Sequence, residues 1–219
     1  ARLVAVSAVA FQTGLTMPLK AMGALCRSYG ALFFVDAIQA LGIVPIDVEE
    51  MHIDFLAAGG HKWLMGPEGT GVLYAAREHA AALTPLNVGW LSHEDPLDFL
   101  FGGEGLLRYD KALRRDIRVI ESGVANAIGF AALDASVTLL LRLGIEAIWR
   151  HVNTWNDALE AGLLARGFTS LRGRCPDQRS GILSVLAPTP SDTVSLHDAL
   201  NGAGVTCNVP DGKLRFAPH

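Results

Sequence analysis

The sequence predicts an α/β fold in which a mainly parallel sheet with crossover helices is followed by a smaller α+β domain. In the first half, short apolar runs typical of strands alternate with segments of helical periodicity, which is the pattern of a parallel sheet. In the second half, two long helical segments precede shorter strand-like and helical runs. We therefore expect part of a large domain over residues 1–143 and part of a small C-terminal domain over residues 144–219.

The strands expected in the large domain are short apolar runs that end at glycine, alanine or a polar residue, and they cover residues 3–6, 32–35, 55–58 and 72–75. The run 32–35 is uniformly apolar, which indicates a strand covered on both faces. A crossover helix is expected after Pro18, because apolar residues recur there at three- and four-residue spacing until Gly30.

Residues 84–110 are rich in Gly, Pro, Asp and aromatic residues without a steady period, and they predict a long irregular connection. Beyond it, helices are expected over residues 127–143 and 145–164, with a break at Gly144. The elements expected in the rest of the small domain are a strand over residues 182–186, a short helix near residues 196–200, and strands near Val205 and Leu214.

The composition argues against several classes of protein. The sequence is 50% hydrophobic and 18% charged, which is far from the composition of disordered chains. The net charge is −4, so no broad cationic field exists to attract nucleic acid or an anionic membrane. The three cysteines show no CxxC spacing, so we expect neither a disulfide framework nor a metal site. The apolar stretches are far shorter than the ~20 residues of a membrane span, and we expect a cytoplasmic protein.

Two polar residues lie where expected strands end. Asp36 closes one strand, and Lys62 follows another. Because the carboxyl ends of parallel strands meet at one edge of a sheet, these side chains are expected to lie close together. Such a pair suits pyridoxal 5'-phosphate, since a lysine amine forms a Schiff base with the aldehyde and a carboxylate keeps the pyridine nitrogen protonated. The spacing alone also fits a strand-capping Asp36 and a solvated Lys62.

The residues around this pair carry a specific resemblance. VDAIQALG at residues 35–42 and GGHKWLMGPEGTG at residues 59–71 closely resemble the class V aminotransferase family of fold-type I PLP enzymes. The resemblance implies a role for each of four residues: Lys62 binds the cofactor covalently, Asp36 pairs with the pyridinium nitrogen, Gln39 lies near the phenolic oxygen, and His61 lies near the phosphate. For His61, packing within the loop is an equal alternative.

Three further segments resemble parts of the same family. ESGVAN at residues 121–126 resembles the start of a long helix that reaches the cofactor phosphate of a neighbouring subunit, which implies a homodimer and places Ser122 and Asn126 near that phosphate. NVGW at residues 87–90 resembles an element in which Trp90 touches the phosphate, with a packed aromatic as the alternative. DGKLRFAPH at residues 211–219 resembles the strand whose arginine, Arg215 here, binds the substrate α-carboxylate through its planar fork.

The sequence also departs from the family pattern. Family members are longer at both ends, so we expect a fragment that lacks both termini. Val124 replaces the usual threonine, Gly59 stands where desulfurases often carry a serine, and Phe11 stands where several carry an asparagine. These differences favour functions other than a typical desulfurase. A desulfurase also needs a mobile cysteine thiolate, whereas Cys207 is expected to be buried and inert.

The resemblance implies an enzyme that acts on the α-amino group of a small-molecule amino acid through an external aldimine. Lys62 would move the α-proton, and Asp36 would stabilise the charge that develops. The leading expectation is either a class V transaminase, which is a transferase, or an epimerase. Two alternatives stay open: β-elimination of the cysteine desulfurase or selenocysteine lyase type, and a truncated PLP fold without catalysis.

Overall fold

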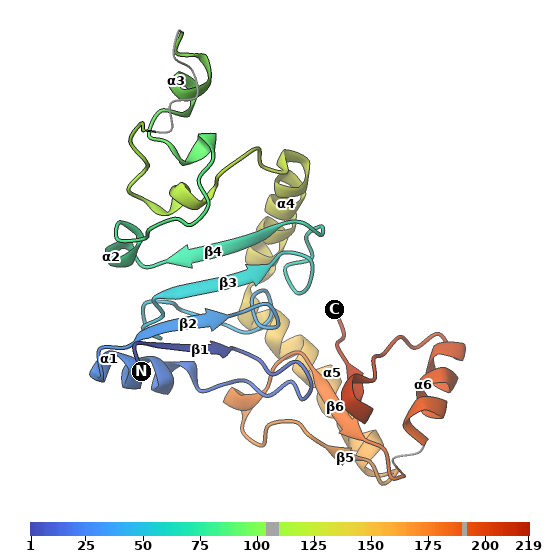
Figure 1. Cartoon of the computed structure of the whole chain (residues 1–219). Helices are drawn as coiled ribbons and strands as arrows, with labels where there is room; N and C mark the ends of the chain where they lie inside the picture. The colour runs from blue at the N-terminus through green and yellow to red at the C-terminus, as the bar shows by residue number, and fades with distance from the viewer. Residues whose placement is uncertain (104–109, 190–191) are drawn as a thin grey trace.

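The computed structural model describes residues 1–103, 110–189 and 192–219, and it contains two separate sheets (Figure 1). The first sheet has the order β1 (Leu3–Ser7), β2 (Leu32–Asp36), β3 (Phe55–Gly59) and β4 (Gly71–Ala75). Its first three strands are parallel, and β4 pairs antiparallel with β3. The second sheet is antiparallel and has the order β5 (Thr169–Ser170), β6 (Leu183–Leu186) and β7 (Leu214–Phe216). The α/β class expected from the sequence is confirmed.

The helices connect and support these sheets. They are α1 (Leu19–Ser28), α2 (Arg77–Ala80), α3 (Pro96–Phe101), α4 (Ala127–Leu143), α5 (Ile145–Leu164) and α6 (Thr193–Gly202). The expected crossover helix, both long helices and the short helix are therefore present. Gly144 separates α4 from α5 with a φ of +83°, a backbone conformation that glycine adopts without steric cost.

The hydrophobic core lies on one face of the first sheet. Phe33 and Val35 of β2 are fully buried on that face, and Leu19 of α1 packs against them. The alternate residue Phe34 is only partly buried. In Figure 1, α4 and α5 lie behind the sheet, and no described helix lies in front of it. The expectation that residues 32–35 are covered on both faces is wrong for the described chain, because only one face carries helices.

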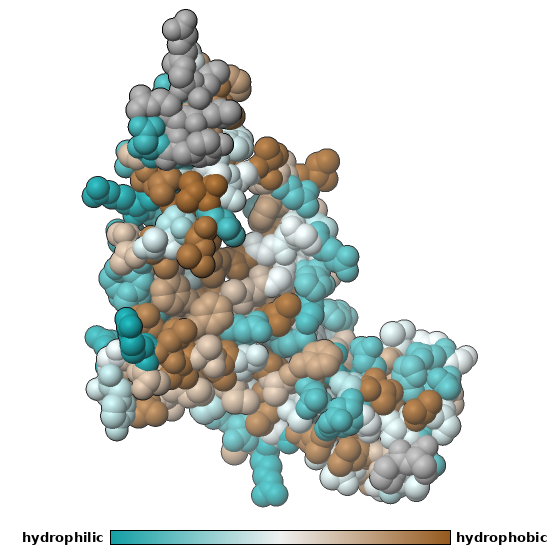
Figure 2. Space-filling model, in the orientation of Figure 1, coloured by the Kyte–Doolittle hydropathy of each residue, from teal (hydrophilic) through white to brown (hydrophobic). Residues whose placement is uncertain are grey.

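The opposite face of the sheet remains apolar. Figure 2 shows hydrophobic residues gathered over the front of the first sheet and at the base of the projecting segment that carries α3. Leu3 of β1 and Leu73 of β4 are exposed there. Among the described residues, no single helix has both the length and the apolar character of a membrane span; α4 and α5 meet both conditions only as a pair bent by 78°.

Helix α5 joins the two halves of the molecule. Ile148 and Val152 in its first half pack into the core of the first sheet. Leu159 and Leu163 in its second half pack against the core of the second sheet. One helix thus packs against both sheets. The domain boundary near residue 143, expected from the sequence, stays a prediction.

Two local expectations need comment. The connection from residue 84 to residue 110 is largely irregular in its described part, with a short 3-10 helix at Trp90–Ser92 and α3; residues 104–109 lie outside the described residues. The strand expected near Val205 is absent from the described structure. Val205 is exposed, and only an isolated bridge between Asn208 and Arg215 forms in this stretch, because the chain turns back into β7 at Asp211.

Candidate active site

The loop that carries Lys62 is held rigidly at the end of β3. The amide of Gly60 donates a hydrogen bond of 2.8 Å to the carbonyl of Thr70, and the amide of Gly66 donates one of 2.8 Å to the carbonyl of Gly60. The amide of Met65 donates to the carbonyl of Lys62, also at 2.8 Å. The loop therefore closes on itself, and the backbone of Lys62 has a defined position.

A glycine brings the turn after β2 against this loop. Gly42 has a φ of +104°, and a β-carbon at that position would lie 2.4 Å from the carbonyl oxygen of Trp63. Only glycine tolerates both the positive φ and the close backbone approach. Gln39, which belongs to the same turn, is thereby placed beside the residues that follow Lys62.

A cavity of about 790 Å³ forms where these segments meet the end of β7. Four of the residues expected to form the site line it, namely Gln39, His61, Lys62 and Arg215. They come from the turn after β2, the loop after β3, and β7 of the other sheet. The cavity is therefore built between the two halves of the chain.

The environment of Lys62 favours its neutral amine. Burial lowers its pKa below the ordinary value for lysine, and the positive charge of Arg215 lowers it further. The carboxylate of Asp36 opposes both effects and raises the pKa, but it is the smallest of the three influences. A lysine with a lowered pKa is a better nucleophile and base near neutral pH.

Arg215 is buried, with 6% of its surface exposed, yet few of its hydrogen-bond donors are used. Its Nη2 donates a bond of 3.3 Å to Oε1 of Gln39, and its Nε has no hydrogen-bond partner. Its guanidinium carbon lies 4.8 Å from the centre of the Phe11 ring. Burial lowers its pKa, as expected for a cation removed from water. The site thus contains an unpaired, desolvated cation.

Asp36 lies at the carboxyl end of β2, beside Ser7 of β1 in the sheet register. Its Oδ1 accepts a hydrogen bond of 3.0 Å from the amide of Ile38, and the hydroxyl of Ser7 donates to its Oδ2 at 3.5 Å. It lines a second cavity of about 450 Å³ on the open face of the sheet, together with Glu121. The carboxylate is therefore oriented, and its charge acts on Lys62 from the neighbouring cavity.

Besides Asp36, three other expected residues, Trp90, Ser122 and Asn126, do not line the Lys62 cavity. Asn126 caps the N-terminus of α4, where its Oδ1 accepts a hydrogen bond of 2.9 Å from the amide of Gly129. Gly89, beside Trp90, packs against Ser122 so closely that a β-carbon would lie 1.9 Å from the Ser122 carbonyl oxygen. The proposed phosphate contacts of Trp90, Ser122 and Asn126 stay predictions.

Several residues of the cavity carry no recognisable signal in the sequence. Phe11 faces Lys62, whose Nζ lies 5.8 Å from the ring centre, and His219 stacks on Trp63 with ring centres 4.4 Å apart. Cys207 also lines the cavity; it is buried, and burial raises the pKa of its thiol. Phe11 and Cys207 lie outside the quoted motifs and His219 ends one of them, but no motif assigns these side chains a contact in the cavity, because only the packing of distant segments brings them there.

The mainly parallel sheet, with Lys62 after the end of β3, and the second sheet that carries Arg215 have the α/β architecture of fold type I. The chain belongs to the aminotransferase class-V family, whose model matches residues 1–209. The family expected from the sequence motifs is therefore confirmed.

The curated relatives include aminotransferases and desulfurases. The chain is 31% identical over 218 residues to the uncharacterized aminotransferase YcbU of Bacillus subtilis, covering 99% of this chain and 54% of the relative. It is 30% identical over 215 residues to a probable cysteine desulfurase of Methanothermobacter thermautotrophicus, covering 95% and 51%. The chain therefore spans about half the length of the curated relatives it matches, as expected for a fragment.

Solved structures agree with the fold. An apo cysteine desulfurase from Thermococcus onnurineus matches with a TM-score of 0.86 at 26% identity, covering all of this chain and 55% of that one. The cystine C-S lyase C-DES, in a mutant with glycine covalently linked to its PLP cofactor, matches with a TM-score of 0.85 at 24% identity, covering 100% and 56%. The second match supports the fold alone.

Proposed function

We propose that this chain forms part of a PLP-dependent enzyme that acts on the α-amino group of an amino acid. The observation that carries the proposal is one cavity lined by both Lys62, whose pKa is lowered, and Arg215, whose donors are largely unpaired. An amino acid has an amine and a carboxylate on the same carbon. A site with a reactive amine and a buried guanidinium is chemically complementary to such a molecule.

The residues present fit pyridoxal 5'-phosphate. The Lys62 amine lines the cavity with a pKa that burial lowers, which suits a covalent bond to the cofactor aldehyde, and the unpartnered Nε of Arg215 leaves a donor for the substrate carboxylate. We assign Lys62 to the covalent bond with the aldehyde, Asp36 to the pyridine nitrogen, and Gln39 and His61 to the polar edge of the ring and its phosphate. The cofactor, when bound, draws electron density away from the substrate α-carbon.

The chain's own residues then have distinct tasks. Arg215 binds and orients the α-carboxylate with two parallel hydrogen bonds. Lys62 accepts and returns a proton, and its lowered pKa matches that role near neutral pH. Asp36, held by the amide of Ile38, maintains a negative charge at the edge of the sheet.

The family resemblance further suggests that the working unit is a homodimer in which Ser122 and Asn126 reach the cofactor phosphate bound in the other copy. The exposure of Val124 and Ile128, at 88% and 87%, supports this proposal, because apolar side chains at a helix start are normally covered. Sedimentation of the full-length protein tests it. A dimer is expected, and a monomer at micromolar concentration would contradict it.

Two candidates remain for the type of reaction. The leading candidate is a transaminase or epimerase, since buried Cys207 has a raised pKa and is unsuited to act as a thiolate nucleophile. The names of several relatives favour cysteine desulfurase instead. Product analysis distinguishes them. A keto acid formed with a second amino acid indicates transamination, and loss of optical activity indicates epimerisation. Alanine formed from cysteine, with the sulfur released as sulfide when a thiol reductant is added, supports the desulfurase.

A further inference from the structure

We propose that Phe11 is a positioning residue that stabilises the buried Arg215 cation while leaving its hydrogen-bond donors free for the substrate carboxylate. This inference rests on the proposed function, in which Arg215 binds that carboxylate. It assigns a task to a side chain that carries no polar group and lies far from Arg215 in the sequence.

The argument begins with the cost of burying an arginine. A buried guanidinium is normally paired with a carboxylate, because removing a charge from water is expensive. A protein carboxylate at Arg215 would occupy the donors that the substrate must use. Within the described residues, the partners of the Arg215 side chain are the neutral amide of Gln39 and the ring of Phe11.

An aromatic ring can stabilise the buried cation and still leave its hydrogen-bond donors free for the substrate. The guanidinium donates hydrogen bonds in its own plane, whereas an aromatic ring attracts the cation through its face. The Phe11 ring therefore stabilises the charge without using any N–H group. Among the described residues, the Nε of Arg215 has no hydrogen-bond partner. A free donor that lines the cavity is what a site awaiting a ligand is expected to contain.

The loop that carries Phe11 is built to hold the ring in place. The amide of Ala10 donates to the carbonyl of Leu15 at 2.9 Å, and the amide of Gly14 donates to the carbonyl of Ala10 at 2.8 Å. The buried hydroxyl of Ser180 donates to the carbonyl of Gly14 at 2.7 Å and anchors the turn. Gly14 has a φ of +75°, and a β-carbon there would lie 2.6 Å from the carbonyl oxygen of Ile182. This backbone is therefore closely constrained.

The test replaces the aromatic face and retains an apolar side chain. Phe11 is half exposed, at 50%, so Phe11→Leu leaves the core intact. With the PLP-loaded protein, we expect the dissociation constant of propionate, a carboxylate without an amine, to rise roughly tenfold in an NMR titration. Phe11→Tyr retains the ring and is expected to bind propionate as the wild type does. Under steady-state assay, KM for the amino acid rises in Phe11→Leu while kcat changes less than twofold.

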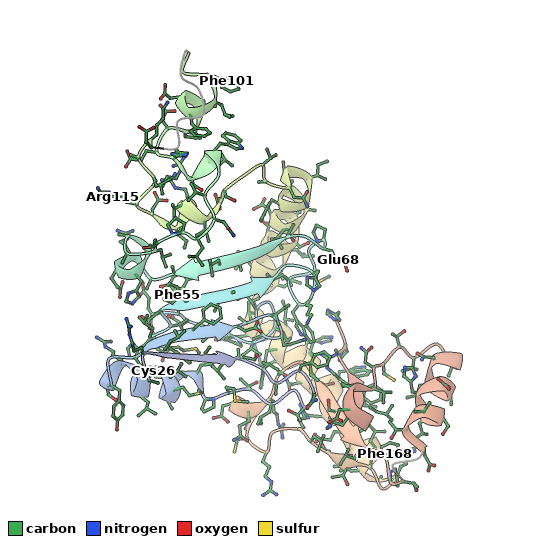
Figure 3. The ribbon with its side chains drawn as sticks, in the orientation of Figure 1. Cys26, Phe55, Glu68, Phe101, Arg115 and Phe168 are labelled. Carbon is green, nitrogen blue, oxygen red and sulfur yellow. The ribbon has the colours of Figure 1, made fainter. Side chains whose placement is uncertain are left out.

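The matched control is Phe101→Leu, the same substitution near the tip of the projecting segment (Figure 3), where no change is expected. Equal propionate affinity in wild type and Phe11→Leu overturns the inference. Equal weakening by leucine and tyrosine also overturns it, because shape rather than the aromatic face would then matter. Propionate binding requires no chemistry. Repeated on the same proteins without PLP, the titration therefore reports the role of Phe11 even if Lys62 proves not to bind the cofactor, an outcome that would contradict the proposed function instead.

Discussion

Arg215 and Gln39 are joined by a hydrogen bond of 3.3 Å between Nη2 and Oε1, although one lies in the second sheet and the other follows a strand of the first. Gln39 lies in the turn after β2, and Arg215 lies in β7. The contact aligns the proposed carboxylate anchor with the cavity that Lys62 lines. Substrate binding is therefore expected to depend on how the two halves of the chain are held together.

Arg215→Lys should weaken substrate binding while keeping the charge. An ammonium cannot make the two parallel hydrogen bonds of a guanidinium, so KM is expected to rise by roughly tenfold or more. Steady-state kinetics with an amino acid substrate measure this effect. Arg166→Lys on the exposed end of α5 is the control and should change nothing. An unchanged KM for Arg215→Lys would show that Arg215 does not bind the substrate carboxylate.

The rate of cofactor incorporation should depend on pH through Lys62. The neutral amine attacks the aldehyde, and its pKa is lowered, so the rate should rise with pH and level off below the pH typical of lysine. Arg215→Gln removes a charge that lowers the pKa, so the midpoint should move to higher pH. Asp36→Asn removes the charge that raises the pKa, so the midpoint should move to lower pH. Stopped-flow absorbance measures both, and shifts in the same direction would refute the electrostatic assignment.

Gly42→Ala should destabilise the protein and displace Lys62. The added methyl group would meet the carbonyl oxygen of Trp63 at a φ of +104°, and we expect a loss of about 2 kcal/mol or more in the free energy of unfolding. Gly30→Ala is the matched control, since Gly30 has a φ of +62° but no neighbour within 4 Å. It should cost about 1 kcal/mol from the backbone conformation alone. Urea denaturation compares them, and equal losses would show that the close approach is unimportant.

Arg172→Ala should weaken the attachment of α5 to the second sheet. The guanidinium of Arg172 bonds the carboxylates of Asp157 and Glu160 at 2.5 and 2.8 Å and Oδ1 of Asn153 at 2.6 Å, with its side chain only 1% exposed. Removing one partner of a buried ion pair costs about 3 kcal/mol.

The control for that variant is Arg118→Ala, which breaks the exposed pair with Asp116. Exposed pairs contribute little to stability, so little change is expected. Thermal unfolding with circular dichroism compares the two variants. Similar effects would mean that Arg172 does not tie the helix to the sheet.

The sequence predicts most of the fold because its elements are periodic and sharply bounded. Gly144 marks the break between α4 and α5, and Asp36 marks the end of β2. The prediction from sequence fails at residues 32–35, because a uniformly apolar run does not reveal whether one or both faces of the strand are covered. It also fails near Val205, where local β propensity lacks a partner strand.

The site was predicted where local motifs carry it. Lys62, Gln39, His61 and Arg215 all belong to recognisable segments, and the structure brings them to one cavity. The role of Phe11 could not be predicted, because its contact with Arg215 depends on two distant segments meeting. The phosphate contacts of Trp90, Ser122 and Asn126 stay predictions, and those of Ser122 and Asn126 would require a second copy of the chain.

The most direct test of the central claim is the ultraviolet–visible spectrum of the purified protein with PLP, recorded before and after borohydride, with mass spectrometry of the reduced peptides. We predict a visible absorption band that borohydride removes and a pyridoxyl adduct on Lys62, both absent in Lys62→Ala. A protein that shows no band with excess PLP, or an adduct on another lysine, would contradict the assignment of Lys62 as the residue that holds the cofactor.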